Sequence, residues 1–426
     1  MAGLAHSKNC PQTVAGASSP GLSATTSWTP RRFHLDSPEV SPILFILIGI
    51  PLISLAWLFW AIRRLKTLGV HRSVPIVLAI CVLGILACYI WIVLARQDIA
   101  GKVPAGPYSI VLLWGLFSLP LIALPSMLGW SLVSIFKVVR RKPPVTTTEA
   151  DPTRRQILGT AAVALPVIAT FGSAAISIPQ RTRFRIREIT VPVPDLPPDL
   201  HGLRIAHLSD THVGKFTHGK LLHELAEATN RLKADLVLLT GDLIDNSIND
   251  LPEALDMVAR IDPRSGLYLI EGNHDLFQGR EKFGQGVLDR GFNLLCDENA
   301  IVTAKGHPIE LLGIRWHGRK NPIEGHVEEV FNNHNPEALP ILLAHHPHAF
   351  DRAAELGIPL TLAGHTHGGQ LMVTPEIGAG PMLFKYWSGL YQKPRGSLVV
   401  SNGAGNWFPL RSAAPAEIVH ITLVRM

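Results

Sequence analysis

Four long apolar segments constrain this chain more than any other feature of its sequence. None of them contains Asp, Glu, Lys, Arg or His, and they cover Pro42–Ile62, Val74–Ala95, Tyr108–Phe136 and Ile157–Ile178. A helix of about 20 apolar residues crosses the hydrocarbon core of a bilayer, where helices satisfy their own backbone hydrogen bonds. We therefore predict four transmembrane helices. Pro120 and Pro125 should kink the third helix, and a surface-lying or buried helix is the alternative for the fourth, which contains Pro166.

The charges between these segments predict their orientation. Basic residues gather in the first connection (Arg63, Arg64, Lys66, Arg72) and in the third (Lys137, Arg140, Arg141, Lys142, Arg154, Arg155). The positive-inside rule places both connections in the cytoplasm. The chain after Ile178 should then be extracytoplasmic, and the membrane lipid bilayer is the first expected partner.

We divide the chain into three regions. Residues 1–40 are rich in Ser, Thr, Pro and Gly and should form a disordered tail, residues 41–180 a membrane region, and residues 181–426 a separate domain. The stretch Thr153–Leu158 (Thr-Arg-Arg-Gln-Ile-Leu) resembles a twin-arginine export motif. Paired arginines before any helix would look similar, and either origin sends the last region outward.

Short apolar runs alternate with helical patterns in residues 181–426, which predicts an α/β domain. The runs are Leu203–Leu208, Leu236–Thr240, Leu267–Ile270, Ile309–Ile314, Ile341–Ala344, Leu360–Ala363, Leu398–Ser401 and Ile418–Val424. Helical patterns cover Lys220–Lys233, Leu251–Ile261 and His348–Leu356. Arg181, Arg183, Arg185 and Arg187 alternate with other residues, which fits one face of a strand or contact with anionic headgroups.

Five of these runs end in residue types that bind metals. The fragments are Asp210-Thr211-His212, Gly241-Asp242-Leu243-Ile244-Asp245, Gly272-Asn273-His274-Asp275, His345-His346-Pro347 and Gly364-His365-Thr366-His367. Sites in open α/β sheets gather at the carboxyl ends of strands. Any one fragment is weak evidence, but five in order are not explained by packing and predict a functional site.

In this order the fragments resemble the motifs of the calcineurin-like metallophosphoesterase superfamily, from about Gly202 to Met426. More narrowly, the chain is similar to a membrane-attached bacterial branch with a twin-arginine-like leader, through Gly368-Gly369-Gln370, Gly389-Leu390-Tyr391, Ser401-Asn402-Gly403 and Pro415-Ala416-Glu417-Ile418. The resemblance implies an α+β four-layer sandwich, in which two facing β-sheets are flanked by helices. It also implies a multi-pass protein of the bacterial cytoplasmic (inner) membrane.

The resemblance further implies two divalent metal ions, Mn, Fe or Zn, and assigns their ligands. The first ion would be held by Asp210, His212 and His367, the second by Asn273, His345 and His365, with Asp242 bridging both. His346 is the alternative to His345. A bridging hydroxide would attack phosphorus. His274 would protonate the leaving oxygen, Asp275 would orient His274, and Asp245 would fix a ligand.

The substrate is less constrained than the reaction. Asn246 stands where phosphoprotein phosphatases carry Arg, which favours diesters or small substrates, and Arg411 is either a replacement phosphate contact or a surface salt bridge. Apolar residues between Leu371 and Phe408 either bind a lipid tail or pack the domain edge. We therefore predict a phosphomono- or phosphodiesterase that acts on a lipid-type phosphoester.

The sequence leaves two alternative functions. A nuclease or nucleotide phosphodiesterase would need a basic and aromatic track, and the last region has no concentrated basic stripe beyond Arg181–Arg187, so no nucleic acid partner is expected. An inert metal-binding sensor subunit is the other alternative, but the apolar segments lack the charges typical of transport pathways. The oligomeric state is not predicted.

Overall fold

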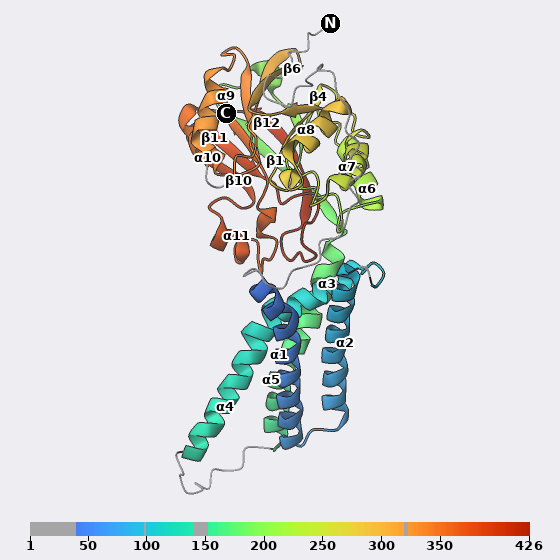
Figure 1. Cartoon of the computed structure of the whole chain (residues 1–426). Helices are drawn as coiled ribbons and strands as arrows, with labels where there is room; N and C mark the ends of the chain where they lie inside the picture. Colours follow the sequence, from blue (N-terminus) through green and yellow to red (C-terminus); the bar gives the residue numbers. More distant parts are fainter. Residues whose placement is uncertain (1–39, 98, 140–151, 319–322) are drawn as a thin grey trace, which may run out of the picture. The chain divides into compact units, whose positions relative to one another are not determined.

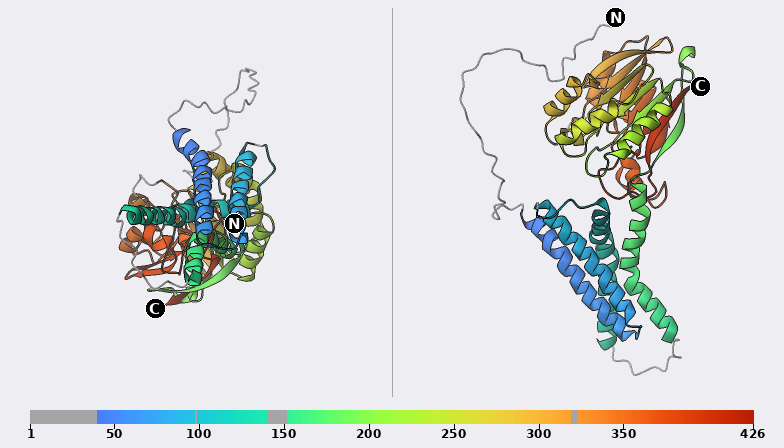
Figure 2. Two further views of the ribbon diagram at one scale, coloured as in Figure 1. Left: turned by 90° about the horizontal axis from the view of Figure 1, so that it is seen from below. Right: turned by 90° about the vertical axis from the view of Figure 1, so that its right-hand side faces the viewer.

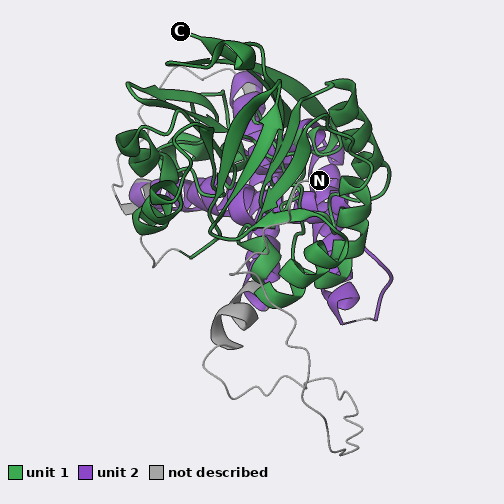
Figure 3. Cartoon of the chain, turned by 90° about the horizontal axis from the view of Figure 1, so that it is seen from above, with its two compact units in different colours: residues 1–14, 177–426 green, residues 15–176 purple. Residues whose placement is uncertain are grey.

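The structure, a computed structural model, describes residues 40–97, 99–139, 152–318 and 323–426 (Figure 1). The predicted disordered tail, apart from its last residue, lies outside the described residues. The described chain forms two compact units, with residues up to 176 in one and residues 177–426 in the other (Figure 3).

The helical unit, which is unit 2 in Figure 3, consists of the helices expected from the four apolar segments. Three of them are α1 (Val40–Thr67), α2 (Ser73–Arg96) and α5 (Pro152–Gln180). The third apolar segment forms one continuous helix that consists of α3 (Ala105–Leu112), a π-helix (Leu113–Ala123) and α4 (Leu124–Val139). Four stretches within them are long and apolar enough to cross a membrane: Ile48–Thr67, Ser73–Arg96, Ala105–Phe136 and Thr153–Gln180. Pro120 lies inside the π-helix. Proline has no N–H to donate to an α-helical hydrogen bond, and the π-helix departs from the regular α-helical hydrogen bonds in this stretch.

Side-chain hydrogen bonds connect the helices of this unit. The indole of Trp114 donates to Ser54 Oγ at 2.9 Å, and Thr170 Oγ1 donates to Ser118 Oγ at 2.7 Å. Trp57 and Trp114 pack edge to face with ring centroids 5.4 Å apart. Small hydroxyl residues commonly link helices in membranes in this way. Because Thr170 belongs to α5, the fourth apolar segment packs within the helical unit, as the side view in Figure 2 also shows.

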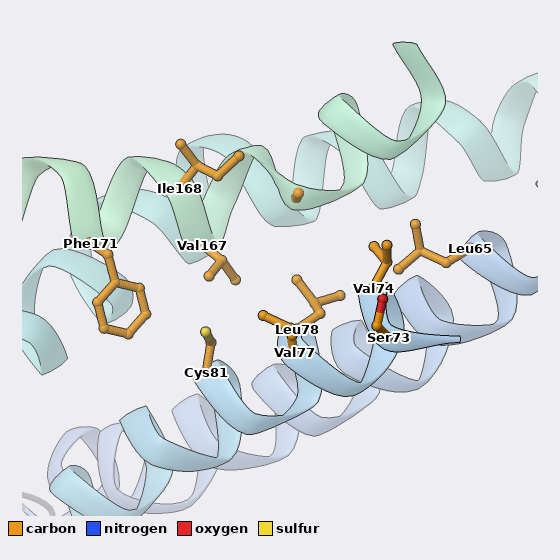
Figure 4. Close-up of a pocket in the computed structure, with 10 residues that line it drawn as sticks. Leu65, Ser73, Val74, Val77, Leu78, Cys81, Val167, Ile168 and Phe171 are labelled. Atoms are coloured by element: carbon orange, nitrogen blue, oxygen red, sulfur yellow. The ribbon is translucent and has the colours of Figure 1, made fainter. Parts of the chain in front are cut away.

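The helical unit contains an apolar pocket of about 470 Å³ (Figure 4). Its wall comes from α1, α2 and α5, and Ser73 and Cys81 are the least apolar of its residues, which are Leu65, Ser73, Val74, Val77, Leu78, Cys81, Ala164, Val167, Ile168 and Phe171. A pocket with this lining offers contacts to hydrocarbon and few hydrogen bonds.

The other unit, which is unit 1 in Figure 3, contains two mixed six-stranded sheets. The first has the order β1-β12-β2-β3-β4-β5, with strands Phe184–Val193, Ala416–Arg425, Arg204–Leu208, Leu236–Thr240, Gly266–Ile270 and Asn293–Leu295. The second has the order β10-β11-β9-β8-β7-β6, with strands Gly389–Lys393, Gly396–Val400, Leu360–Ala363, Leu339–Leu343, His307–Gly313 and Glu298–Ala304. Strands β2, β3, β4 and β5 run parallel, as do β7, β8, β9 and β11.

Alternation along the strands explains why these sheets form layers. Ile205 and Leu238 belong to the apolar core shared by the two sheets, whereas their neighbours Ala206 and Val237 belong to the core under the helices. The first sheet is covered by α6 (Lys220–Arg231), α7 (Leu251–Val258) and α8 (Arg280–Asp289), and the second by α9 (Ile323–Asn332) and α10 (Ala349–Leu356). The predicted pair of sheets flanked by helices is confirmed.

Two of the four period-two arginines, Arg185 and Arg187, lie in β1, whereas Arg181 and Arg183 precede it. The two arginines in the strand are used inside the protein. Arg185 donates to the buried carboxylate of Glu417 at 2.8 and 3.0 Å, and Arg187 approaches the same carboxylate at 3.4 Å. These two arginines are therefore neutralised within the domain. Strands β5, β6 and β10 and helices α8, α9 and α11 (Ala379–Leu383) were not predicted.

Candidate metal centre

The candidate ligands lie in loops that follow the strands, and their backbones are strained. Five of them have positive φ angles between 46° and 69°: Asp210, His212, Asp242, His365 and His367. This conformation is costly for a residue with a side chain and concentrates at functional sites. Gly364 is required beside them, because a Cβ there would collide with Ser209 Oγ and with the Asp210 carboxylate. The loops are therefore built to bring polar side chains together.

Asp210, His212 and His367 form the first donor group, with their potential ligand atoms all within 4.8 Å of one another. The Nε2 atoms of His212 and His367 are 3.0 Å apart, and His367 Nε2 is 3.3 Å from Asp210 Oδ1. All three residues are buried. Two imidazoles and a carboxylate that converge in this way form a suitable pocket for a divalent cation.

Asp242, His345 and His365 form the second donor group, again within 4.8 Å. His345 Nε2 lies 3.1 Å from Asp242 Oδ2 and 3.2 Å from His365 Nδ1. The same Asp242 oxygen lies 3.5 Å from His212 Nε2 in the first group. One carboxylate therefore faces both groups, as a bridging ligand must.

Asn273 completes the set of predicted ligands. Its Oδ1 atom is buried and has no hydrogen-bond partner within the described chain. A buried amide oxygen without a partner carries a cost in free energy, and a hard or borderline cation would remove that cost. The residues present thus fit two divalent metals, with donors of the types that Mn, Fe and Zn accept.

The pKa values of the histidines differ within each donor group, which pairs one histidine of low pKa with one of high pKa. Burial lowers the pKa of His365 to about 3 and that of His367 to about 4, so both rings are neutral. Burial also opposes the charged form of His212 and His345. Nearby carboxylates outweigh it and raise their pKa values to about 10 and about 9. Metal ions would have to displace protons from these two rings.

Hydrogen bonding distinguishes His345 from its neighbour. His345 Nδ1 lies 2.7 Å from the carbonyl oxygen of Thr240, so its N–H donates there and Nε2 points into the second donor group. His346 instead contacts His348, with their Nδ1 atoms 2.9 Å apart. Of the two histidines, it is His345 that the structure brings to the donor group.

The residues predicted to act on protons are all present, but one role is wrong. His274 Nδ1 lies 2.8 Å from the carbonyl oxygen of Asp245 and 3.3 Å from its carboxylate, so Asp245 orients this ring. Asp275 does not do so, because its carboxylate accepts hydrogen bonds from the backbone N–H groups of Ile244 and Gly272. Burial beside Asp242 raises the pKa of Asp275 to about 7. Asp275 therefore braces the two loops that carry Asp242 and Asn273.

Arg411 fits neither expectation, because it is fully buried. Its guanidinium donates to Asn406 Oδ1 and to the carbonyl oxygens of Asn402, Ala414 and Gly405, and lies 3.2 Å from His367 Nδ1. It cannot form a surface salt bridge or reach a phosphate in solvent. It supports the loop behind His367.

Aromatic residues surround the donor groups, and two of them were missed from the sequence. The ring centroid of Trp316 is 5.2 Å from that of His365. The ring centroid of Phe277 is 4.6 Å from that of His274, and Phe277 is 56% exposed. Trp407, which was among the predicted apolar residues, is 6.1 Å from His274 and 44% exposed. The missed pair has no motif, and only the position of Trp316 shortly after β7 could have signalled a place near the site.

An ion-pair network was also missed. The buried carboxylate of Glu271 is 3.1 Å from Arg315 Nε and 3.2 Å from Arg280 Nε. Since Glu271 precedes the Gly272–Asn273 loop, this network anchors the loop that carries a candidate ligand.

Comparison with known proteins matches this domain to a family. Residues 203–369 match the family model described as calcineurin-like phosphoesterase. A zebrafish (Danio rerio) transmembrane protein with metallophosphoesterase domain is 32% identical over 269 residues, covering 60% of this chain and 60% of the relative. An uncharacterised metallophosphoesterase of Helicobacter pylori is 32% identical over 227 residues, which is 52% of this chain and 60% of the relative. The chain thus spans about 60% of the length of these two relatives.

Among solved structures, phosphopantetheinyl hydrolase from Mycobacterium tuberculosis aligns with a TM-score of 0.32 and 11% identity, covering 49% of this chain and 91% of that chain. The names of the relatives and the four long apolar helices together support a membrane protein.

Proposed function

We propose that this chain, in which residues 203–369 form a calcineurin-like phosphoesterase domain, is a membrane-anchored phosphoester hydrolase with two divalent metals, Mn, Fe or Zn. Membership of this family supports phosphoester hydrolysis. The observation that carries the two-metal proposal is the position of Asp242, whose Oδ2 lies 3.1 Å from His345 in one donor group and 3.5 Å from His212 in the other.

Two bound metals would supply Lewis-acid stabilisation of the phosphoryl oxygens and a nucleophile at neutral pH. The protein would hold them with Asp210, His212, Asp242, Asn273, His345, His365 and His367. His274 donates its Nδ1–H to the carbonyl of Asp245, which leaves Nε2 to exchange a proton with the leaving oxygen. The backbone N–H of His274 donates to Asp242 Oδ1 at 2.8 Å, which fixes the loop carrying His274 relative to the central carboxylate.

A lipid-type phosphomono- or phosphodiester is the proposed substrate. Trp407 and Phe277 present exposed aromatic surface beside His274, which suits the apolar part of a substrate. A neighbouring segment exposes large apolar side chains to an unusual degree: Val373, Ile377, Met382 and Leu383 are 62–84% exposed. Apolar surface of this kind binds at a membrane interface.

The location of the reaction is part of the same proposal. Residues 181–183 alone separate α5 from β1, so the covalent connection keeps the domain near any bilayer that α5 crosses. The basic first and third connections support an extracytoplasmic domain. The Helicobacter pylori relative supports the inner membrane of a bacterium as the location. Nucleic acid is not a proposed partner.

The test is hydrolysis by the full chain in detergent, loaded with Mn²⁺. Substrates are p-nitrophenyl phosphate, bis-p-nitrophenyl phosphate, phospholipid in mixed micelles and single-stranded DNA. We expect phospholipid to be cleaved faster than DNA and Asp242→Asn to lower the rate by more than roughly 100-fold, since even residues that only support a metal ligand change activity 10- to 100-fold. Asp262→Asn, an exposed carboxylate, is the matched control and should retain the wild-type rate.

Each alternative has its own outcome. Preferential cleavage of DNA would replace the lipid by a nucleic acid as substrate. Failure to cleave any of the four substrates would favour an inert metal-binding subunit. A wild-type rate in Asp242→Asn would refute the bridging assignment.

A further inference from the structure

A second cluster of metal-binding residue types lies outside the seven candidate ligands. Asp297 lies in the turn between β5 and β6, where the chain passes from one sheet to the other. His317 follows β7, and His326 is in the first half of α9. The fold thus brings three separate segments together at these side chains.

The geometry of the cluster is compact. One potential ligand atom from each of Asp297, His317 and His326 lies within 4.8 Å of the others. His317 Nε2 is 2.9 Å from Asp297 Oδ2, and the two imidazole rings are parallel, with an interplanar angle of 4° and centroids 3.3 Å apart. The side chains of His317 and Asp297 are only 16% and 14% exposed.

A histidine–aspartate ion pair explains only part of this arrangement. That pair needs one imidazole, whereas a second imidazole is stacked directly on the first. Two imidazoles and one carboxylate are a common ligand set for divalent transition metals, with the remaining position open to water.

We propose that Asp297, His317 and His326 bind an additional divalent transition metal ion of the zinc class, separate from the two-metal centre. The ion joins the crossover between the sheets, the segment after β7 and helix α9.

The proposed ion has a structural consequence for the active site. The backbone N–H of Arg315 donates to Asp297 Oδ1 at 3.1 Å, and the Arg315 side chain contacts Glu271. Trp316 follows, and its ring packs 5.8 Å from His345 and 5.2 Å from His365. Asp297 is hydrogen-bonded to Arg315, and His317 follows Trp316 in the chain. By fixing Asp297 and His317, the ion positions the Trp316 ring beside the active site without touching the reacting phosphate.

The first test measures the metal content of the full chain in detergent. Each variant is saturated with Zn²⁺, passed through a desalting column and analysed by inductively coupled plasma mass spectrometry. His326→Gln should bind about one equivalent fewer per chain than the wild type, because it removes one of the three ligands. His334→Gln, close in sequence to α9 but outside the cluster, is the matched control and should bind as the wild type does. Equal zinc in His326→Gln and wild type would overturn the proposal.

A second measurement uses the wild-type chain and so does not depend on whether a variant folds. Histidines are modified with diethyl pyrocarbonate with and without Zn²⁺, and each modified peptide is quantified by mass spectrometry. Zinc should protect both His317 and His326 and leave His334 unchanged. Modification of His317 and His326 at the same rate with and without Zn²⁺ would overturn the proposal. Neither readout depends on catalysis, so a chain without hydrolase activity could still show this site.

Discussion

Arg411→Met is expected to destabilise the unit formed by residues 177–426 strongly, since it removes a fully buried cation and retains an apolar stem of similar length. In the wild type, the guanidinium donates to three backbone carbonyl oxygens at 2.7–3.0 Å and to Asn406 Oδ1 at 2.9 Å. Each buried acceptor left without a donor costs about 1–3 kcal/mol. Relaxation and water entry recover part of this cost, and removing one partner of a buried charge network typically costs about 3–5 kcal/mol. We expect a loss in this range.

The assay is thermal unfolding of the full chain in detergent, followed by intrinsic tryptophan fluorescence. A loss of about 3–5 kcal/mol corresponds to a fall in Tm of roughly 6–20 °C for a unit of this size. Arg264→Met is the matched control, because Arg264 is 56% exposed and its contact with Asp235 is 3.5 Å long. That variant should change stability by less than about 0.5 kcal/mol. If Arg411→Met melted within a few degrees of the wild type, the buried network would not stabilise the domain as we argue.

Three further outcomes are expected. Metal affinity, measured by titration at several pH values, should rise between pH 7 and pH 9. The pKa values of His212 and His345 are raised to about 10 and about 9, so bound metal must displace protons from both rings. An affinity that did not change with pH would contradict these protonation states. Asn273→Ala should change the free energy of unfolding by less than about 1 kcal/mol yet weaken metal binding at least roughly 10-fold, since Asn273 Oδ1 has no partner in the described chain whose hydrogen bond could be lost. Trp407→Ala should raise the KM for phospholipid micelles more than that for p-nitrophenyl phosphate, and equal changes in the two KM values would argue against a lipid contact.

The sequence predicted the parts of the fold that depend on local patterns. Strands β2, β3 and β4, which end at Leu208, Thr240 and Ile270, were predicted because each contains a short apolar run that is soon followed by a polar fragment. Strand β5 was missed because its three residues, Asn293–Leu295, are too few to show alternation. Helix α8 was missed because few of its residues are apolar, and burial of Phe283 and Val287 rather than periodicity fixes its position.

Contacts between distant segments could not be read from the sequence. The role of Asp275 came from the family resemblance and was wrong, because its carboxylate accepts hydrogen bonds from backbone amides instead of from His274. Arg411 follows an ordinary Pro-Leu dipeptide, and its burial depends on loops that close over it. The cluster of Asp297, His317 and His326 has no motif, since its members meet only when the two sheets and α9 assemble.

The number of metal ions needed for activity tests the central claim most directly. The full chain is stripped of metal with a chelator, and its activity towards bis-p-nitrophenyl phosphate is measured. It is then titrated with Mn²⁺ while hydrolysis is followed. His326→Gln serves as the background, so that the additional proposed site takes up no metal. A two-metal centre bridged by Asp242 predicts that activity is restored only as about two equivalents bind. Full activity after one equivalent, or activity that survives metal removal, would contradict the account.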